Sequence, residues 1–168
     1  METIGVLAAI WRYPVKALRA QPLACAEVTA GGLAGDRAAA LFVRSGHART
    51  GKTLRGKEHD RLHLIGDATQ AATAAAERGI DVELRAAEAH YFDDAPVSLI
   101  VDRWLAGLEA YVGYRVDALR FRPNFFVRAD PAFAGDEASL EGATIAIGET
   151  RLRVRGPIGR CAVPTYDL

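Results

Sequence analysis

Short apolar runs separated by glycine, proline and polar clusters dominate the pattern of hydrophobic and polar positions along the chain. Runs of this length and spacing are typical of β-strands rather than of long amphipathic helices. We expect strands at residues 4–11, 23–29, 38–43, 62–65, 80–84 and 97–101. A further pair at 144–147 and 151–155, joined by a turn at Gly148, predicts a hairpin whose second strand carries arginines on one face.

Two segments instead have the features of helices. Residues 67–78 begin with Asp67, which suits an N-cap, and continue through an alanine-rich stretch that Gly79 follows. Residues 102–111 place apolar side chains on one face and reach Gly113 near their end. Many short strands with two helices favour a mostly β (α+β) fold, in which a β-barrel carries the attached helices.

The charge balance and the cysteine content limit the class of protein. The 168-residue chain carries 21 basic and 21 acidic side chains, which argues against a general nucleic-acid-binding protein. Its apolar runs are too short to span a bilayer, and its first residues lack a secretory signal pattern. We therefore expect a cytoplasmic protein without membrane or nucleic-acid partners, in which Cys25 and Cys161 stay reduced.

The C-terminal third holds the residues best suited to chemistry. Arg122 and Asn124 lie within an aromatic stretch, where buried polar groups need partners, either in a structural network or on a ligand. Arg122 offers a planar fork that matches phosphate or carboxylate. Cys161 adjoins Arg160, and nearby arginines favour the reactive thiolate. From these residues alone, a structural network and a buried, inert cysteine stay open as the plainer interpretations.

A competing motif lies in the polar segment 44–60, which we expect to be an exposed loop. Residues 46–53 match the pattern G-x-x-x-x-G-K-[ST] of a phosphate-binding P-loop, in which Lys52 and Thr53 would contact a nucleotide. Such a loop must open a helix, whereas Gly56 and polar residues follow here. A nucleotide-binding protein is the alternative from a different class, and a helix after Thr53 would favour it.

Four segments, taken in their order along the chain, carry a family resemblance. They are residues 11–18 (WRYPVKAL), 32–37 (GLAGDR), 121–125 (FRPNF) and 159–167 (GRCAVPTYD). Each is weak alone, but together they resemble the MOSC family, named for the C-terminal domain of molybdenum-cofactor sulfurase. The arrangement is similar to that of the longer members with an N-terminal β-barrel portion, including the mitochondrial amidoxime-reducing components.

The resemblance implies a protein that binds the molybdenum cofactor. Separated cations suit the dianionic phosphate of its pterin, because they form charge-assisted hydrogen bonds with it. The residues implied to bind the cofactor are Lys16, Arg37, Arg122, Asn124 and Arg160. Cys161 takes the position that ligates molybdenum or carries sulfur in the family, and a soft thiolate suits such a centre.

The resemblance also implies an organisation and a choice of activities. Residues 1–94 would form the N-terminal β-barrel-like portion and residues 95–168 the core portion, intertwined in one compact unit. The protein would be an oxidoreductase for a small N-hydroxylated substrate or a sulfur carrier, with a separate electron-transfer protein or cysteine desulfurase as partner. Ala17 and Gly159 replace serines usual in the family, so a cofactor-free sulfur-handling or binding protein of this fold is a further alternative.

Overall fold

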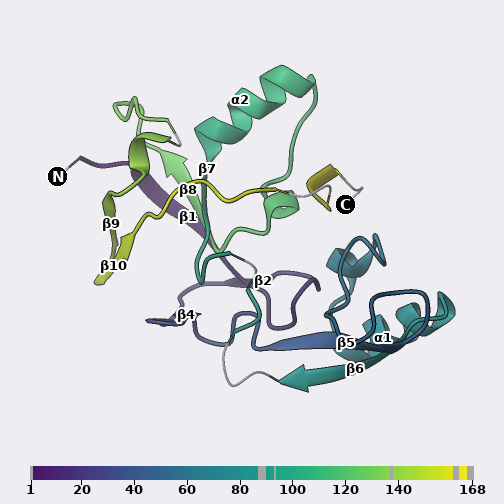
Figure 1. The fold of residues 1–168 in the computed structure, drawn as a ribbon. Coiled ribbons are helices and arrows are strands. Elements are labelled where there is room, and N and C mark those ends of the chain that lie inside the picture. The colour runs from purple at the N-terminus through teal and green to yellow at the C-terminus, as the bar shows by residue number, and fades with distance from the viewer. Residues whose placement is uncertain (1, 87–89, 93, 137, 161–162, 166–168) are drawn as a thin grey trace.

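The computed structural model describes the chain except for residues 1, 87–89, 93, 137, 161–162 and 166–168 (Figure 1). The strands are β1 (Gly5–Arg12), β2 (Gln21–Leu23), β3 (Val28–Thr29), β4 (Gly32–Leu33), β5 (Ala39–Ser45), β6 (Asp81–Ala86), β7 (Leu99–Val101), β8 (Phe125–Ala129), β9 (Thr144–Ile147) and β10 (Thr150–Arg153). The helices are α1 (Ala68–Glu77) and α2 (Asp102–Val112), with 3₁₀ helices η1 (Leu62–Leu64), η2 (Ala118–Phe121), η3 (Ala138–Leu140) and η4 (Val163–Thr165). The fold is mixed and mostly β, with two α-helices in this part of the chain, as the sequence predicts.

The largest sheet joins the N-terminal strand to the C-terminal third of the chain. Its strand order is β2–β1–β8–β7. β1 runs antiparallel to β2 and to β8, and β7 is parallel to β8. The strands between β2 and β7 therefore lie outside this sheet, which pairs the N-terminal strand with the C-terminal third of the chain.

The helix α2 follows β7 directly and packs against β7 and β8. Its buried residue Leu105 belongs to an apolar cluster with Ile100, Val116 and Ala118. Gly113 ends the helix in the left-handed conformation, with φ 79°, which glycine adopts without a side-chain clash. The predicted second helix is thus confirmed, including the residue that ends it.

The other helix, α1, covers the two-stranded sheet of β5 and β6 at the opposite end of the molecule (Figure 1). Asp67 caps its N-terminus by accepting a hydrogen bond from the backbone N–H of Gln70 at 2.9 Å. Ala71 and Ala75 are fully buried, because their small side chains let the helix approach the sheet closely. This predicted helix is also confirmed.

The hairpin expected near the C-terminus is present as β9 and β10, with Ile147 opposite Thr150. The described strands form this hairpin, the pairs β3–β4 and β5–β6, and the four-stranded sheet. No closed barrel occurs among these strands, so the barrel stays a prediction.

Three expectations from the sequence are wrong. Residues 23–29 do not form one strand, because β2 ends at Leu23 and β3 begins only at Val28. Residues 62–64 form the 3₁₀ helix η1 instead of a strand, because a short apolar run does not by itself distinguish these elements. The segment 46–53 does not open a helix: Thr53 pairs with Phe42 of β5, and the next α-helix begins only at Ala68. The P-loop hypothesis therefore lacks the helix N-terminus on which a P-loop binds phosphate.

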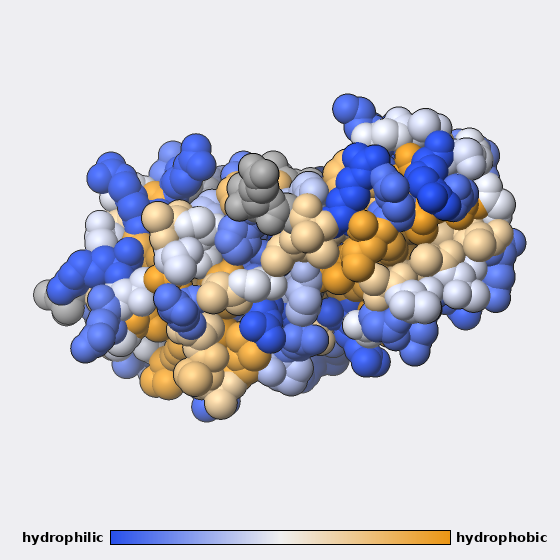
Figure 2. All heavy atoms as spheres, turned by 90° about the horizontal axis from the view of Figure 1, so that it is seen from below, coloured by the Kyte–Doolittle hydropathy of each residue, from blue (hydrophilic) through white to orange (hydrophobic). Residues whose placement is uncertain are grey.

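The surface carries no long apolar helix among the described residues that would be able to cross a membrane. On the face seen in Figure 2, charged and apolar residues are interspersed. Single large apolar side chains are nevertheless exposed, such as Leu84 on β6 and Tyr111 on α2. Isolated exposures of this kind are normal for a folded protein and need no binding partner.

Candidate functional site

A cavity of about 400 Å³ brings together residues from the N-terminal motif, the glycine-rich loop and the C-terminal third. We call it the basic cavity, because it is lined by Lys16, Arg37, Arg55, Lys57, Arg120, Arg122 and Arg160. Asp94 is the one acidic residue among its described lining residues. In a chain with zero formal net charge, this clustering creates a local positive potential that attracts anions.

Two of these arginines are held around the ring of Tyr13, which is 1% exposed. The Arg37 guanidinium lies 4.7 Å and the Arg122 guanidinium 4.1 Å from the centre of that ring. Burial raises the pKa of Tyr13 to about 12, although both arginines act in the opposite direction. The protonated hydroxyl donates a hydrogen bond to the carbonyl of Pro123 at 3.0 Å. Tyr13 therefore fixes the spacing of two cations.

The backbone at this cavity is unusual. Ala17, Arg37 and Arg122, with φ values of 70°, 48° and 51°, are the non-glycine residues with positive φ in the described structure, and all three line the basic cavity. A non-glycine residue in this conformation is disfavoured by about 1–2 kcal/mol. Conformations of this cost persist where surrounding contacts enforce them, and they cluster at ligand sites.

The contacts that enforce the Arg37 conformation come from the loop before it. Asp36 is 2% exposed, and its carboxylate accepts a hydrogen bond from the backbone N–H of Tyr13 at 2.7 Å. The other oxygen of Asp36 forms an ion pair with Arg37. Arg37 also donates to the backbone carbonyl of Arg122 at 3.2 Å. Asp36 thus positions Arg37, a role that sequence reasoning missed although it quoted the GLAGDR motif.

The remaining predicted cations also reach the basic cavity. Lys16 is positioned by the hydrogen bond from its backbone N–H to Ala39 at 2.8 Å. Arg160 donates to the carbonyl of Phe121 at 3.0 Å, and its guanidinium lies 5.7 Å from the centre of that ring. Four of the five predicted cofactor-binding residues therefore line one cavity.

Asn124, the fifth, does not line the basic cavity and is 1% exposed. Its side-chain oxygen accepts a hydrogen bond from the backbone N–H of Ser98 at 3.1 Å, and its amide donates to the carbonyl of Trp11 at 3.2 Å. These bonds connect β1 to the segment before β7. The side chain thus takes part in a structural network, two residues from Arg122 at the cavity.

Cys161, the predicted catalytic residue and metal ligand, lies outside the described residues. The nearest described residues on either side that line the basic cavity are Arg160 and Pro164. Arg120 donates to the carbonyl of Pro164 at 3.1 Å and so links η2 to η4. Arg160 and Pro164 therefore both lie at the basic cavity.

Sequence reasoning also missed several lining residues. Arg55 and Lys57 belong to a segment expected to be an exposed loop, and the signal for them was its basic composition.

His59 and His63 have a spacing that gives only a weak signal for a metal site. His63 lines the cavity, whereas His59 is buried and its pKa is lowered by burial and by the charge of Arg78. No group of residues suited to hold a metal occurs within the described ranges.

A buried aromatic ring, two arginines held against it and further cations around a cavity are features suited to an anionic ligand. Residues 86–168 match the model of the MOSC domain. The chain carries a MOSC domain over these residues, which supports the family resemblance of its motifs. Searches of curated proteins and of solved structures gave no match.

Proposed function

We propose that the protein binds the molybdenum cofactor in the basic cavity and works through Cys161, as a sulfur carrier or as an oxidoreductase. MOSC domains are associated with the biology of this cofactor. The observation that carries the proposal is the convergence of Lys16, Arg37, Arg122 and Arg160 on one cavity. These residues are distant in sequence, and their convergence gives a set of cationic donors suited to an anionic ligand.

The donor set fits the phosphate-bearing pterin of this cofactor. Guanidinium groups present several donors in a plane and bind phosphate through paired, charge-assisted hydrogen bonds. The cavity volume of about 400 Å³ lies within the range of small-ligand sites. Tyr13 holds Arg37 and Arg122 before a ligand arrives, which reduces the entropy lost on binding. Lys16, Arg37, Arg122 and Arg160 would hold the phosphate and the pterin.

In this proposal, Cys161 would be the reactive residue. When bound, the cofactor supplies a molybdenum centre for oxygen- or sulfur-atom transfer. Cys161 follows Arg160 directly in the sequence, and cations near a thiol favour the thiolate, the form that ligates metals and carries sulfur. The arginines would orient the ligand towards this residue. A sulfur carrier and an oxidoreductase differ in whether the thiolate holds transferable sulfur or stays on the metal.

The test is co-purification from cells that make the cofactor. We expect wild-type protein to carry molybdenum and an oxidisable pterin, measured by elemental analysis and by fluorescence after oxidation. Arg122→Ala should lower the bound pterin at least tenfold, because one charge-assisted bond contributes about 1.5–3 kcal/mol. Cys161→Ser should retain the pterin but lose molybdenum or labile sulfur. Arg128→Ala on β8, outside the basic cavity, is the matched control.

Two outcomes would change the proposal. If the Arg122→Ala protein retains as much pterin as Arg128→Ala, the basic cavity is not the cofactor site. If wild-type protein carries no pterin but binds inorganic phosphate in an Arg122-dependent way, the cofactor-free binding protein is favoured.

A further inference from the structure

The strand β6 forms an open edge of the sheet that it shares with β5. β5 is paired on both of its sides, because Phe42 also bridges to Thr53 on the side away from β6. Among the described strands, none pairs with the outer side of β6, which lies at the margin of the molecule (Figure 1). An unpaired strand edge is a template for pairing with a further strand.

The hydrogen bonds of β5 show which backbone groups of β6 face this open edge. Val43 forms backbone hydrogen bonds with the loop 51–52, so its N–H and C=O point away from β6. The neighbouring Phe42 therefore directs its own N–H and C=O towards β6, where Glu83 lies opposite it. Because successive residues of a strand alternate in this direction, the N–H and C=O of Leu84 face the open edge.

The side chains of β6 are complementary to themselves about Leu84. Glu83 and Arg85 lie on one face of the strand and form an ion pair with each other. Leu84 lies on the other face and is 53% exposed, whereas Val82 on that same face is buried in the cluster that α1 covers. An exposed leucine alone needs no partner, but this one stands between opposite charges at the centre of an unpaired edge.

We propose that β6 pairs antiparallel with β6 of a second copy of the chain, about a twofold axis at Leu84. In this register each Leu84 exchanges its outward backbone hydrogen bonds with the partner's Leu84. Glu83 lies opposite the partner's Arg85, and Arg85 lies opposite the partner's Glu83. Opposite charges and apolar pairs placed directly across from each other stabilise paired strands. The two sheets become one four-stranded sheet with both copies of α1 on the same face.

The charges of β6 select this register over its neighbours. An axis at Glu83 or at Arg85 would place two like charges directly opposite each other, which destabilises paired strands. An axis at Val82 would place Glu83 opposite the partner's Asp81, which is again a pair of like charges. The axis at Leu84 is the one of these four that places opposite charges across from each other.

The length of the open edge sets the strength of the association. The pairing would extend from Val82 to Ala86, where the carbonyl of Ala86 already accepts a hydrogen bond from the hydroxyl of Tyr91 at 3.4 Å. Interfaces that bury less than about 1,200 Å² in total belong to weak, reversible complexes. We therefore expect a dimer in equilibrium with the monomer. None of the described lining residues of the basic cavity lies on β6, so this inference is independent of the proposed function.

The test measures the mass of the full chain by sedimentation equilibrium over a hundredfold range of concentration. We expect the wild-type protein to pass from monomer to dimer as its concentration rises. Leu84→Lys places two positive charges opposite each other at the axis and should weaken the dimer at least tenfold. Tyr111→Lys is the matched control, because Tyr111 is an exposed apolar residue on α2, and it should change the dissociation constant less than twofold.

A charge exchange tests the register itself. Glu83→Arg and Arg85→Glu each place like charges opposite each other, so either variant alone should dimerise at least tenfold more weakly than the wild type. An equimolar mixture restores opposite charges at both positions and should form heterodimers with about wild-type affinity, which native mass spectrometry resolves. This recovery would also show that both variants are folded.

Three outcomes would overturn the proposal. The first is a chain that stays monomeric over the whole range of concentration. The second is a dimer that neither Leu84→Lys nor the two charge variants weaken, since its interface then lies elsewhere. The third is an equimolar mixture of the charge variants that associates no better than its components.

Discussion

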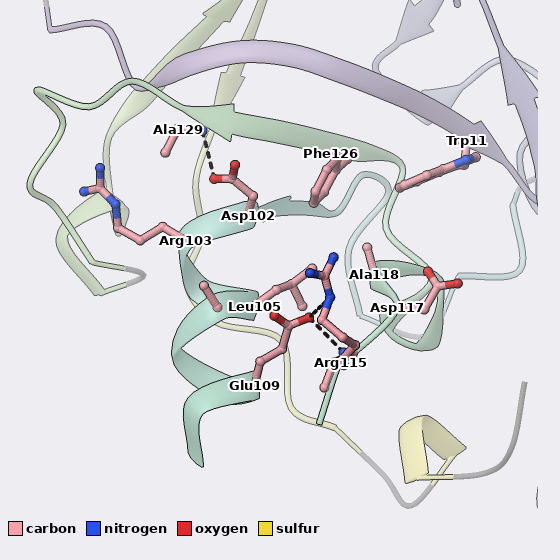
Figure 3. A pocket seen from close by; sticks show the side chains of 12 residues that line it. Trp11, Asp102, Arg103, Leu105, Glu109, Arg115, Asp117, Ala118, Phe126 and Ala129 are labelled. Atoms are coloured by element: carbon pink, nitrogen blue, oxygen red, sulfur yellow. Dashed lines mark hydrogen bonds and ion pairs between the residues drawn. The ribbon is translucent and has the colours of Figure 1, made fainter. Parts of the chain in front are cut away.

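The basic cavity and the groove beside α2 differ in how the protein uses their charged side chains. The α2 groove, about 640 Å³, is the larger of the two (Figure 3). Its Asp102 accepts a hydrogen bond from the backbone N–H of Ala129 at 2.9 Å, and Glu109 accepts one from Val116 at 2.8 Å. Arg103 donates to the backbone carbonyls of Asp130 and Phe133, in the loop after β8. These charges stabilise the fold itself.

The balance of charge differs as well. The described residues of the α2 groove include acidic and basic side chains in similar number, and Glu109 lies beside Arg115 (Figure 3). The basic cavity instead opposes seven cations to Asp94 among its described lining residues. Volume alone would select the groove as the ligand site, whereas the surplus of positive charge selects the basic cavity. The proposed site is therefore chosen by its cationic lining and not by its volume.

The largest expected effect is a loss of phosphate affinity when charge is removed from the basic cavity but not when it is removed from the α2 groove. The double variant Arg37→Ala and Arg122→Ala should lower the affinity for inorganic phosphate at least a hundredfold, because two charge-assisted bonds of about 1.5–3 kcal/mol each are lost. Arg103→Ala with Arg115→Ala removes the same number of charges from the α2 groove and should leave that affinity within twofold. Calorimetry measures both, and equal losses would show that only the overall charge matters.

The sequence predicts much of this fold where the signals are local. Asp67 and Gly79 bracket α1, and Gly113 ends α2, because capping and left-handed glycine conformations depend on neighbouring residues alone. Four of the seven cations of the basic cavity are also predictable from the sequence, but only through the order of the family motifs. Pairing of β1 with β8 depends on residues far apart, and no local pattern encodes it.

The separate roles of Arg122 and Asn124 were beyond sequence reasoning. Both lie in a stretch that reads as a strand, yet Arg122 has a φ of 51° and β8 begins only at Phe125. This turn directs one side chain to the basic cavity and leaves the other buried between β1 and Ser98. Arg55 and Lys57 were missed for a related reason, since their loop is brought to the cavity by tertiary contacts.

The second prediction separates structural from ligand-binding polar groups. Asn124→Ala should lower the free energy of unfolding by about 3 kcal/mol, because the Ser98 N–H and the Trp11 carbonyl lose partners in the core. The phosphate affinity of the remaining folded protein should stay within threefold. Chemical denaturation and calorimetry measure the two effects. Ser98→Ala, which keeps the backbone N–H, is the control and should cost less than about 1 kcal/mol. A loss of affinity without a loss of stability would contradict the structural role.

The third prediction concerns the ring between the two arginines. Tyr13→Leu should weaken phosphate binding about tenfold, because Arg37 and Arg122 lose the cation–π contacts that preset them, each about 0.5–2 kcal/mol. Tyr13→Phe keeps the ring and should restore most of the affinity, although it loses the bond to Pro123. If Phe fails as badly as Leu while both variants fold, the hydroxyl and not the ring positions the arginines.

The smallest expected effect is on the free energy of unfolding. The same alanine-to-glycine substitution should raise it in the basic cavity and lower it in the α2 groove. Ala17 lines the basic cavity with φ 70°, so Ala17→Gly should raise the free energy of unfolding by about 0.5 kcal/mol, as relief of strain exceeds the added freedom of the unfolded chain. Ala106 lines the α2 groove from within α2, so Ala106→Gly should lower it by about 1 kcal/mol through loss of helix propensity. Thermal and chemical unfolding measure both values. A loss of stability at both positions would mean that the conformation of Ala17 is unstrained, and that the basic cavity does not differ from the groove in its backbone.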